Sequence, residues 1–187
     1  MLQKVANANY ELGRFPLGGD ERYPRYVVVC KFNGMTYFHI RQYERKGERE
    51  YPTKVGTCMT PKRFAMFLLT VPKIEEAKKE IDGESESVDV KEHIGGGVYI
   101  AAKSGKDIIN IRKHFMPSGS AAPVPTRMGI GLRFPEWDKL MECIENMKNP
   151  SPDLANAEPC FNGNDHANLM GFLQCPECCP HEIDLQY

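Results

Sequence analysis

Short apolar runs, each closed by a turn signal, dominate the hydrophobic pattern of the chain. Two dipeptides, Asn33-Gly34 and Ser104-Gly105, follow apolar runs of strand length. Since such dipeptides favour tight hairpin turns, we expect a strand on either side of each. The predicted strands are Tyr26–Phe32, Met35–Tyr43 and a third near Gly56–Met59, then Val98–Lys103, Lys106–Phe115 and a third near Gly129–Leu132.

An amphipathic helix is predicted after each third strand. Thr60 and Pro61 fit the N-cap and first position of one helix, and Pro135 fits the first position of the other. Apolar residues recur at helical spacing in both, at Phe64, Phe67, Leu68 and Val71 and at Trp137, Leu140, Met141 and Ile144. Each stripe predicts a helix that packs on a sheet. Pro72 either interrupts the first helix or lies within a longer one.

These elements occur twice, as an internal repeat. Gly34, Ile40 and Arg41 match Gly105, Ile111 and Arg112 at a spacing of 71 residues, whereas Gly56 matches Gly129 at 73. The two extra residues fall in a loop, where an insertion costs little. The pattern therefore predicts an α+β fold of two repeats, each an antiparallel β-sheet backed by one C-terminal helix.

Composition narrows the class of protein. Of 187 residues, 41% are hydrophobic and 26% charged, which suits a globular chain. No run of about 18 apolar residues predicts a membrane span, and the N-terminal residues lack the apolar core of a signal peptide. The seven cysteines are odd in number, so we expect a reducing compartment rather than a disulfide framework.

Charge is segregated along the chain, although the net charge is only −1. Residues 10–70 hold 11 basic and 6 acidic residues, and residues 94–134 hold 6 and 1. The remaining stretches 71–93 and 135–187 are acidic, with net charges of −4 and −8. Basic strands that also carry aromatic residues are typical of single-stranded nucleic-acid binding, because cations follow the phosphates and rings stack on bases. Solvated strand charges above core aromatics are the alternative interpretation.

The candidate nucleic-acid-binding residues are the basic and aromatic residues of the predicted strands. They are Arg14, Lys31, Phe32, Arg41, Tyr43 and Lys54 in the first repeat, and Lys103, Lys106, Arg112, Lys113, Phe115 and Arg127 in the second.

Several of these residues stand in motifs that resemble the single-stranded-DNA-binding domain of the transcriptional coactivator positive cofactor four family. The first repeat has Leu12-Gly13-Arg14, Tyr26-Val27, Phe32-Asn33-Gly34, Ile40-Arg41-Gln42-Tyr43 and Lys54-Val55-Gly56 in the family's order. The second has Ile111-Arg112-Lys113-His114-Phe115-Met116, Arg127-Met128-Gly129-Ile130 and Trp137. The likeness covers roughly residues 10–75 and 94–148.

The resemblance implies that each unit is a curved sheet backed by a helix, and that two units pair to grip single-stranded DNA. Two copies in one chain would then pair as an intramolecular pseudo-dimer. We expect repeats at residues 10–75 and 94–148, an acidic linker at 76–93 and a cysteine-containing acidic tail at 149–187. The family also implies a nuclear location and transcription-machinery partners, with RNA or melted duplex as other ligands.

The chain departs from the family at the two aromatic positions that stack on bases. The first repeat keeps Phe32 but has Glu44 at the second position, whereas the second has Lys103 at the first position and keeps Phe115. Phe115 has the strand parity of the apolar Ile109 and Ile111, so a core position is its alternative. For Arg41 and Arg112, a salt bridge to an acidic helix residue is the alternative.

The tail carries the remaining chemistry-bearing residues. Cys175, Cys178, Cys179 and His181 have a spacing compatible with zinc, with Cys160 or His166 to complete a tetrahedron. No second ligand pair stands at a defined spacing, so we expect free thiols and no metal or other cofactor. No catalytic motif is present, and we expect no enzyme. The alternative to DNA binding is a protein-interaction module in transcription with weak nucleic-acid affinity.

Overall fold

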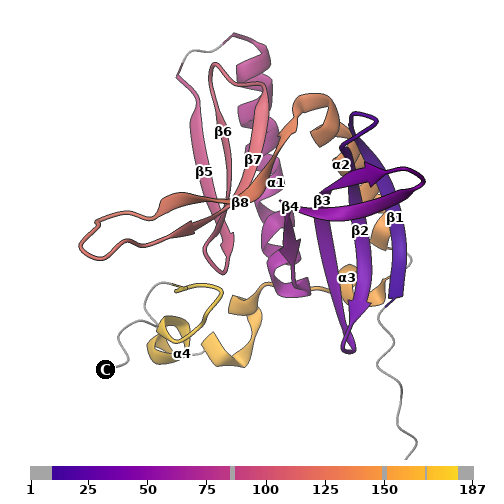
Figure 1. Cartoon of the computed structure of the whole chain (residues 1–187). Coiled ribbons are helices and arrows are strands. Elements are labelled where there is room, and N and C mark those ends of the chain that lie inside the picture. Colours follow the sequence, from indigo (N-terminus) through magenta and orange to yellow (C-terminus); the bar gives the residue numbers. More distant parts are fainter. Residues whose placement is uncertain (1–9, 85–86, 149–150, 167, 181–187) are drawn as a thin grey trace, which may run out of the picture.

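Two antiparallel sheets with helices between them make up the fold (Figure 1). The computed structural model describes residues 10–84, 87–148, 151–166 and 168–180. Sheet one contains β1 (Tyr10–Gly19), β2 (Pro24–Phe32), β3 (Met35–Lys46) and β4 (Arg49–Met59). Sheet two contains β5 (Asp89–Gly95), β6 (Val98–Lys103), β7 (Ile108–Phe115) and β8 (Val124–Arg133). Both sheets follow chain order, so the repeat predicted from the sequence is present.

Each sheet has four strands, one more than the pattern predicts, because β1 and β5 pair with the outer edges of β2 and β6. These strands are hard to recognise from composition. β1 contains three glycines and a proline, and its pairing with β2 is irregular in two places. β5 begins with alternating exposed and half-buried residues, three of the first four charged, which suits an edge strand with one solvated face.

The prediction of an acidic linker at residues 76–93 is therefore wrong for most of that segment. Its first part is the end of α1 (Pro61–Asp82), and its last part is β5. Val88 is buried although its neighbours in sequence are largely charged. Most acidic residues of the segment lie at exposed or half-buried positions of α1 and β5, so its composition resembles that of a linker although most of it is regular.

α1 continues through Pro72 rather than ending there. Thr60 caps the helix as predicted, since its side chain accepts a hydrogen bond from the backbone N–H of Arg63. A proline inside a helix costs about 3 kcal/mol. Ile74, Ala77 and Ile81 lie beyond the proline and are buried. Burial of these three side chains offsets the free-energy cost of the proline. Packing therefore allows the helix to continue past Pro72 to Asp82.

The helices link the two repeats rather than each backing only its own sheet. α1 packs mainly on β5 and β6 of sheet two, and α2 (Phe134–Lys148) contacts both β1 of sheet one and β8 of sheet two. This corrects the prediction of one helix per sheet. Because α1 follows sheet one in the chain but packs mainly on sheet two, it joins the two sheets into one core.

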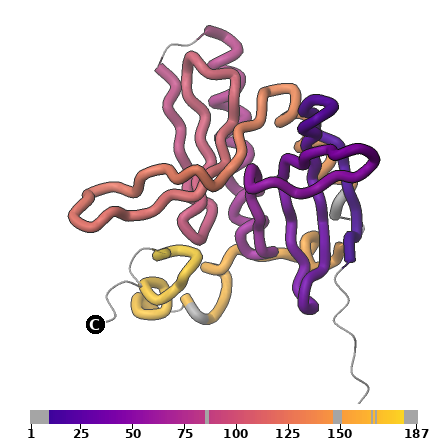
Figure 2. The backbone as a smooth tube through the Cα atoms, in the orientation of Figure 1, coloured from indigo at the N-terminus to yellow at the C-terminus, as the bar shows by residue number. Residues whose placement is uncertain are grey.

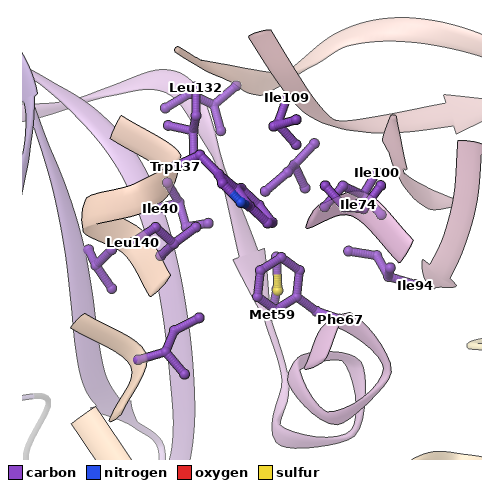
Figure 3. Packing of buried hydrophobic residues seen from close by; sticks show 14 of the residues in the cluster. Ile40, Met59, Phe67, Ile74, Ile94, Ile100, Ile109, Leu132, Trp137 and Leu140 are labelled. Carbon is purple, nitrogen blue, oxygen red and sulfur yellow. The ribbon is translucent and has the colours of Figure 1, made fainter. Parts of the chain in front are cut away.

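That core is continuous across both repeats (Figure 3). Trp137 of α2 is fully buried, and its ring lies 5.9 Å from that of Phe67 on α1. The indole N–H of Trp137 donates to Glu75 of α1 at 2.5 Å. Arg25 of β2 donates to Glu136 of α2 at 2.9 Å and to the carbonyl of Gly131 at 3.0 Å. These contacts connect elements that are far apart in sequence.

The tail consists of short elements beside the two repeats (Figure 2). They are α3 (Pro152–Ala155), the 3-10 turns η1 (Cys160–Asn162) and η2 (Asn164–His166), and α4 (Leu169–Leu173). No described helix is long and apolar enough to cross a membrane.

Candidate nucleic-acid interface

The outer face of each sheet, opposite the shared core, carries a cluster of basic and aromatic residues that includes the predicted Arg14, Arg41, Tyr43 and Arg112. On sheet one, Arg14 of β1 lies over two tyrosine rings, 5.1 Å from the centroid of Tyr26 and 4.6 Å from that of Tyr43. The two rings meet edge to face at 5.4 Å. Tyr26 is directly opposite Arg41 in the β2–β3 register. We call Arg14, Tyr26, Arg41 and Tyr43 the first quartet.

Sheet two has an equivalent arrangement that sequence comparison missed. Lys91 of β5 lies 5.2 Å from the ring of Tyr99, and Tyr99 packs against His114 at 4.5 Å. Tyr99 is opposite Arg112 in register, as Tyr26 is opposite Arg41. Lys91, Tyr99, Arg112 and His114 form the second quartet. Strand pairing brings these four residues together. Their proximity follows from the register of the strands and could not be read from their spacing along the chain.

Arg41 and Arg112 make the same backbone contact in the two repeats. Arg41 donates to the carbonyl of Thr53 at 3.4 Å, and Arg112 donates to that of Thr126 at 3.0 Å. No carboxylate of the described residues lies within salt-bridge distance of either guanidinium. The alternative of an ion pair with a helix is therefore wrong, and each arginine is positioned by the neighbouring strand of its own sheet.

A β-bulge follows each of these arginines in the pairing with the last strand of its sheet. The register shifts between Arg41 and Tyr43 and again between Arg112 and His114, and the extra residues lie on β4 and β8. β7 itself keeps its alternation, so His114 lies on the face of Arg112, where it is buried. Phe115 has the opposite parity but is 50% exposed, because it lies beyond the last residue of β7 that pairs with β6. The core alternative for Phe115 is therefore wrong.

Glycine is required beside both arginines. A Cβ on Gly56 would lie 2.7 Å from the carbonyl oxygen of Ile40, and one on Gly129 would lie 2.5 Å from that of Ile111. The strands approach too closely there for any side chain. This close approach explains why a glycine recurs after Lys54-Val55 and after Arg127-Met128 in the two bulges.

The aromatic candidates of sheet one differ in accessibility. Phe32 is 49% exposed beside the β2–β3 turn, as expected. Tyr43 is only 7% exposed, because Tyr26 and Arg14 cover it. Tyr43 therefore packs under the guanidinium of Arg14 and cannot offer a free ring face to a base in this arrangement.

Lys103 does not occupy the position of Phe32 in the second repeat. Counting four residues along the strand from the equivalent tyrosines Tyr26 and Tyr99 leads to Cys30 and Lys103. The β6–β7 hairpin is two residues shorter, so Phe32 has no counterpart there. Matching by the turn glycines alone concealed this difference.

Ion pairs divide the predicted cations into two groups. Arg14 pairs with Glu11 at 2.8 Å, Lys31 with Asp153 at 3.9 Å and Lys103 with Asp89 at 2.6 Å. Other predicted cations have no carboxylate within 4.0 Å among the described residues, namely Arg41, Lys54, Lys106, Arg112, Lys113 and Arg127. Four of these six belong to the second repeat, so free positive charge is concentrated there. Lys113 and Arg127 lie at the bulge where the β7–β8 hairpin begins to extend as an arm beyond the sheet (Figure 1).

A shallow hollow of about 340 Å³ lies on the outer face of sheet one. Its lining includes Lys31, Phe32 and Arg41, together with Tyr10 and His39, which are not among the residues predicted from the sequence. Burial, and then the charge of Arg41, lowers the pKa of His39 to about 4. His39 is therefore neutral near pH 7 and adds no positive charge to the hollow.

Comparison with known proteins gives one partial likeness. Over 58 residues the chain is 33% identical to the RNA polymerase II transcriptional coactivator KELP of Arabidopsis thaliana. The match covers 31% of this chain and 35% of that protein, so it spans about a third of the relative's length. No family model matches, and no solved structure gives a significant match. The chain is thus distantly similar, over one part of its length, to a transcriptional coactivator.

Proposed function

We propose that this chain binds single-stranded DNA on the outer faces of its two sheets and acts in the nucleus as a transcriptional coactivator. The observation that carries the proposal is the recurrence of one basic-aromatic quartet on both sheets. In each, a cation lies over a tyrosine that is paired in register with an arginine. The likeness to a transcriptional coactivator supports the transcriptional role. The role is binding rather than catalysis.

In this proposal the unpaired cations hold the phosphates and the exposed rings hold the bases. Lys113 and Arg127 lie beside the exposed Phe115 at the base of the β7–β8 arm. Single strands present base faces to such rings, whereas a duplex hides them in its stack. Binding therefore favours single strands over duplex. RNA and melted duplex share these features and remain ligands of the same class.

The two repeats act as an internal pair in this proposal. The continuous core and the packing of α1 on sheet two support it, because neither sheet covers its apolar face alone. We expect light scattering of the purified chain to give the mass of one chain. A stable dimer would carry four sheets and would contradict internal pairing.

A protein-interaction role in transcription is the second candidate. It is favoured by the ion pairs of Arg14, Lys31 and Lys103, which neutralise part of the predicted phosphate-binding set. In this version the sheets bind nucleic acid weakly, and transcription-machinery proteins are the main partners.

A titration distinguishes the two candidates. A fluorescent oligonucleotide is titrated with the chain as a single strand and as a duplex, each at two salt concentrations. DNA binding predicts tighter binding of the single strand and a loss of affinity with salt, because counterions are released from phosphates. Equal and weak binding of both forms would favour the protein-interaction role.

A further inference from the structure

Four metal-ligand side chains from separate parts of the tail converge at one point. They are Cys160 at the start of η1, His166 at the end of η2, and Cys175 and Cys178 in the loop after α4. Their ligand atoms all lie within 4.8 Å of one another. Among the described residues, this is the one such group that the structure brings together.

The separations fit a tetrahedral zinc site. With Zn–S near 2.3 Å and Zn–N near 2.0 Å, neighbouring ligand atoms stand about 3.5–3.8 Å apart. The Sγ atoms of Cys160 and Cys178 are 3.2 Å apart, and Cys178 Sγ lies 3.3 Å from His166 Nε2. The other ring nitrogen of His166 is buried without a hydrogen-bond partner in the described part of the chain. The imidazole therefore directs its polar contact into the cluster.

The loop that carries two of the cysteines is shaped to present them together. The backbone N–H of Cys179 donates to the carbonyl of Cys175 at 2.8 Å, which closes a tight turn. The turn brings the sulfurs of Cys175 and Cys178 into one group of ligand atoms that all lie within 4.8 Å of one another.

The tail has little else to hold it in shape. Its helices have four or five residues, and Phe161, Leu169, Met170 and Phe172 are exposed. Of its described residues only Ser151, Leu154 and Cys160 are buried. Segments with so small an apolar core usually need a disulfide or a structural metal.

We propose that Cys160, His166, Cys175 and Cys178 form a structural zinc site that fixes the tail to both repeats. This set differs from that considered from the sequence: Cys179 lies outside the cluster, and His181 lies outside the described residues. Sequence spacing grouped the neighbouring cysteines, whereas the fold of the tail recruits Cys160 and His166.

Glu177, between the two loop ligands, shows how the site reaches the repeats. Its carboxylate accepts hydrogen bonds from Arg63 of α1 at 3.0 and 2.9 Å. Its backbone carbonyl accepts from the N–H of Gly96, in the β5–β6 turn, at 2.9 Å. Zinc would hold this loop in the conformation that makes both contacts. The tail lies beside this turn and the start of α1 (Figure 2).

The test measures metal in the full-length chain, purified without chelators or a metal-binding tag. Elemental analysis is expected to find one zinc per chain. Cys175→Ser and Cys178→Ser should lose the zinc. The matched controls Cys179→Ser and Cys143→Ser should keep it, because neither sulfur belongs to the cluster.

Two further measurements guard against loss of zinc through misfolding. Cobalt added to metal-free wild-type chain should give the d–d absorption of a tetrahedral thiolate site, and zinc should displace it. Thiol titration of the chain denatured with a chelator should count all seven cysteines as free thiols, which tests for a disulfide. A chain without zinc, a Cys160–Cys178 disulfide, a different bound metal, or zinc retained in Cys178→Ser would overturn the proposal.

Discussion

At the residue scale, exposure of an aromatic ring depends on what packs around it more than on residue type. Phe115 and Tyr43 are both aromatic residues on strands, yet Phe115 is half-exposed and Tyr43 is buried. Tyr43 is covered by Tyr26 and Arg14, whereas Phe115 lies beyond the last residue of β7 that pairs with β6. The proposed base contacts therefore depend on local backbone geometry.

Phe115→Ala should weaken binding of a single-stranded oligonucleotide. Stacking on an exposed ring contributes about 1–3 kcal/mol, so the dissociation constant should rise about 5- to 150-fold in a fluorescence titration. Leu69→Ala is the control, because Leu69 is also exposed but lies on α1. Unchanged affinity in Phe115→Ala would remove this ring from the interface.

His39 should make stability depend on pH. Its pKa in the folded chain is about 4, below the ordinary value of 6.5. Between these values the unfolded chain takes up a proton that the folded chain does not, so the free energy of unfolding should fall as the pH drops from about 6.5 to about 4. This contribution is fully present above pH 6.5.

Urea denaturation at several pH values measures this dependence. His39→Gln should show a smaller loss of stability than the wild type over the same interval. Identical pH profiles for the two chains would mean that burial does not depress the His39 pKa.

At the scale of elements, the β7–β8 hairpin differs from the β3–β4 hairpin in its ion pairs. Both hairpins extend as arms (Figure 1), but the bulge at the base of the β7–β8 arm carries Lys113 and Arg127 without carboxylate partners among the described residues. In sheet one, Arg14 and Lys31 are engaged by Glu11 and Asp153. The second repeat should therefore provide more of the electrostatic affinity.

Lys113→Ala and Arg127→Ala should each reduce the salt dependence of single-strand binding. Each phosphate contact contributes about 0.7 to the slope of log K against log salt. Affinity measured at four or more salt concentrations gives this slope. Lys139→Ala, on the exposed side of α2, should leave it unchanged. Equal slopes in all variants would place the phosphates elsewhere.

At the scale of the whole molecule, one core unites two repeats that the sequence separates. Phe67 on α1 and Trp137 on α2 are in contact at its centre (Figure 3). Because the helices carry apolar contacts from one sheet to the other, the two repeats cannot unfold independently without exposing this core.

A single cooperative unfolding transition is therefore expected. Fluorescence of Trp137, the only tryptophan, and circular dichroism should give coincident urea curves. Phe67→Ala should lower the free energy of unfolding by about 3–5 kcal/mol in both signals. The exposed Leu69→Ala should change it by less than about 0.5 kcal/mol. Separate transitions would indicate two independent domains.

The sequence by itself determined the repeat, six of the eight strands and the start of both helices. These features depend on local signals, such as Asn33-Gly34 in a turn or Thr60 before Pro61. The basic and aromatic character of the strands was also visible in the sequence, since composition does not depend on how the chain folds.

Only the tertiary structure decided which side chains meet. Strand register assembled the quartets, and the end of the β6–β7 pairing at Lys113 left Phe115 exposed. Packing against sheet two carried α1 through Pro72 and placed β5 in a segment rich in charge. The folding of the tail brought Cys160 to Cys178. Each of these outcomes rests on contacts between residues distant in sequence, which local patterns do not encode.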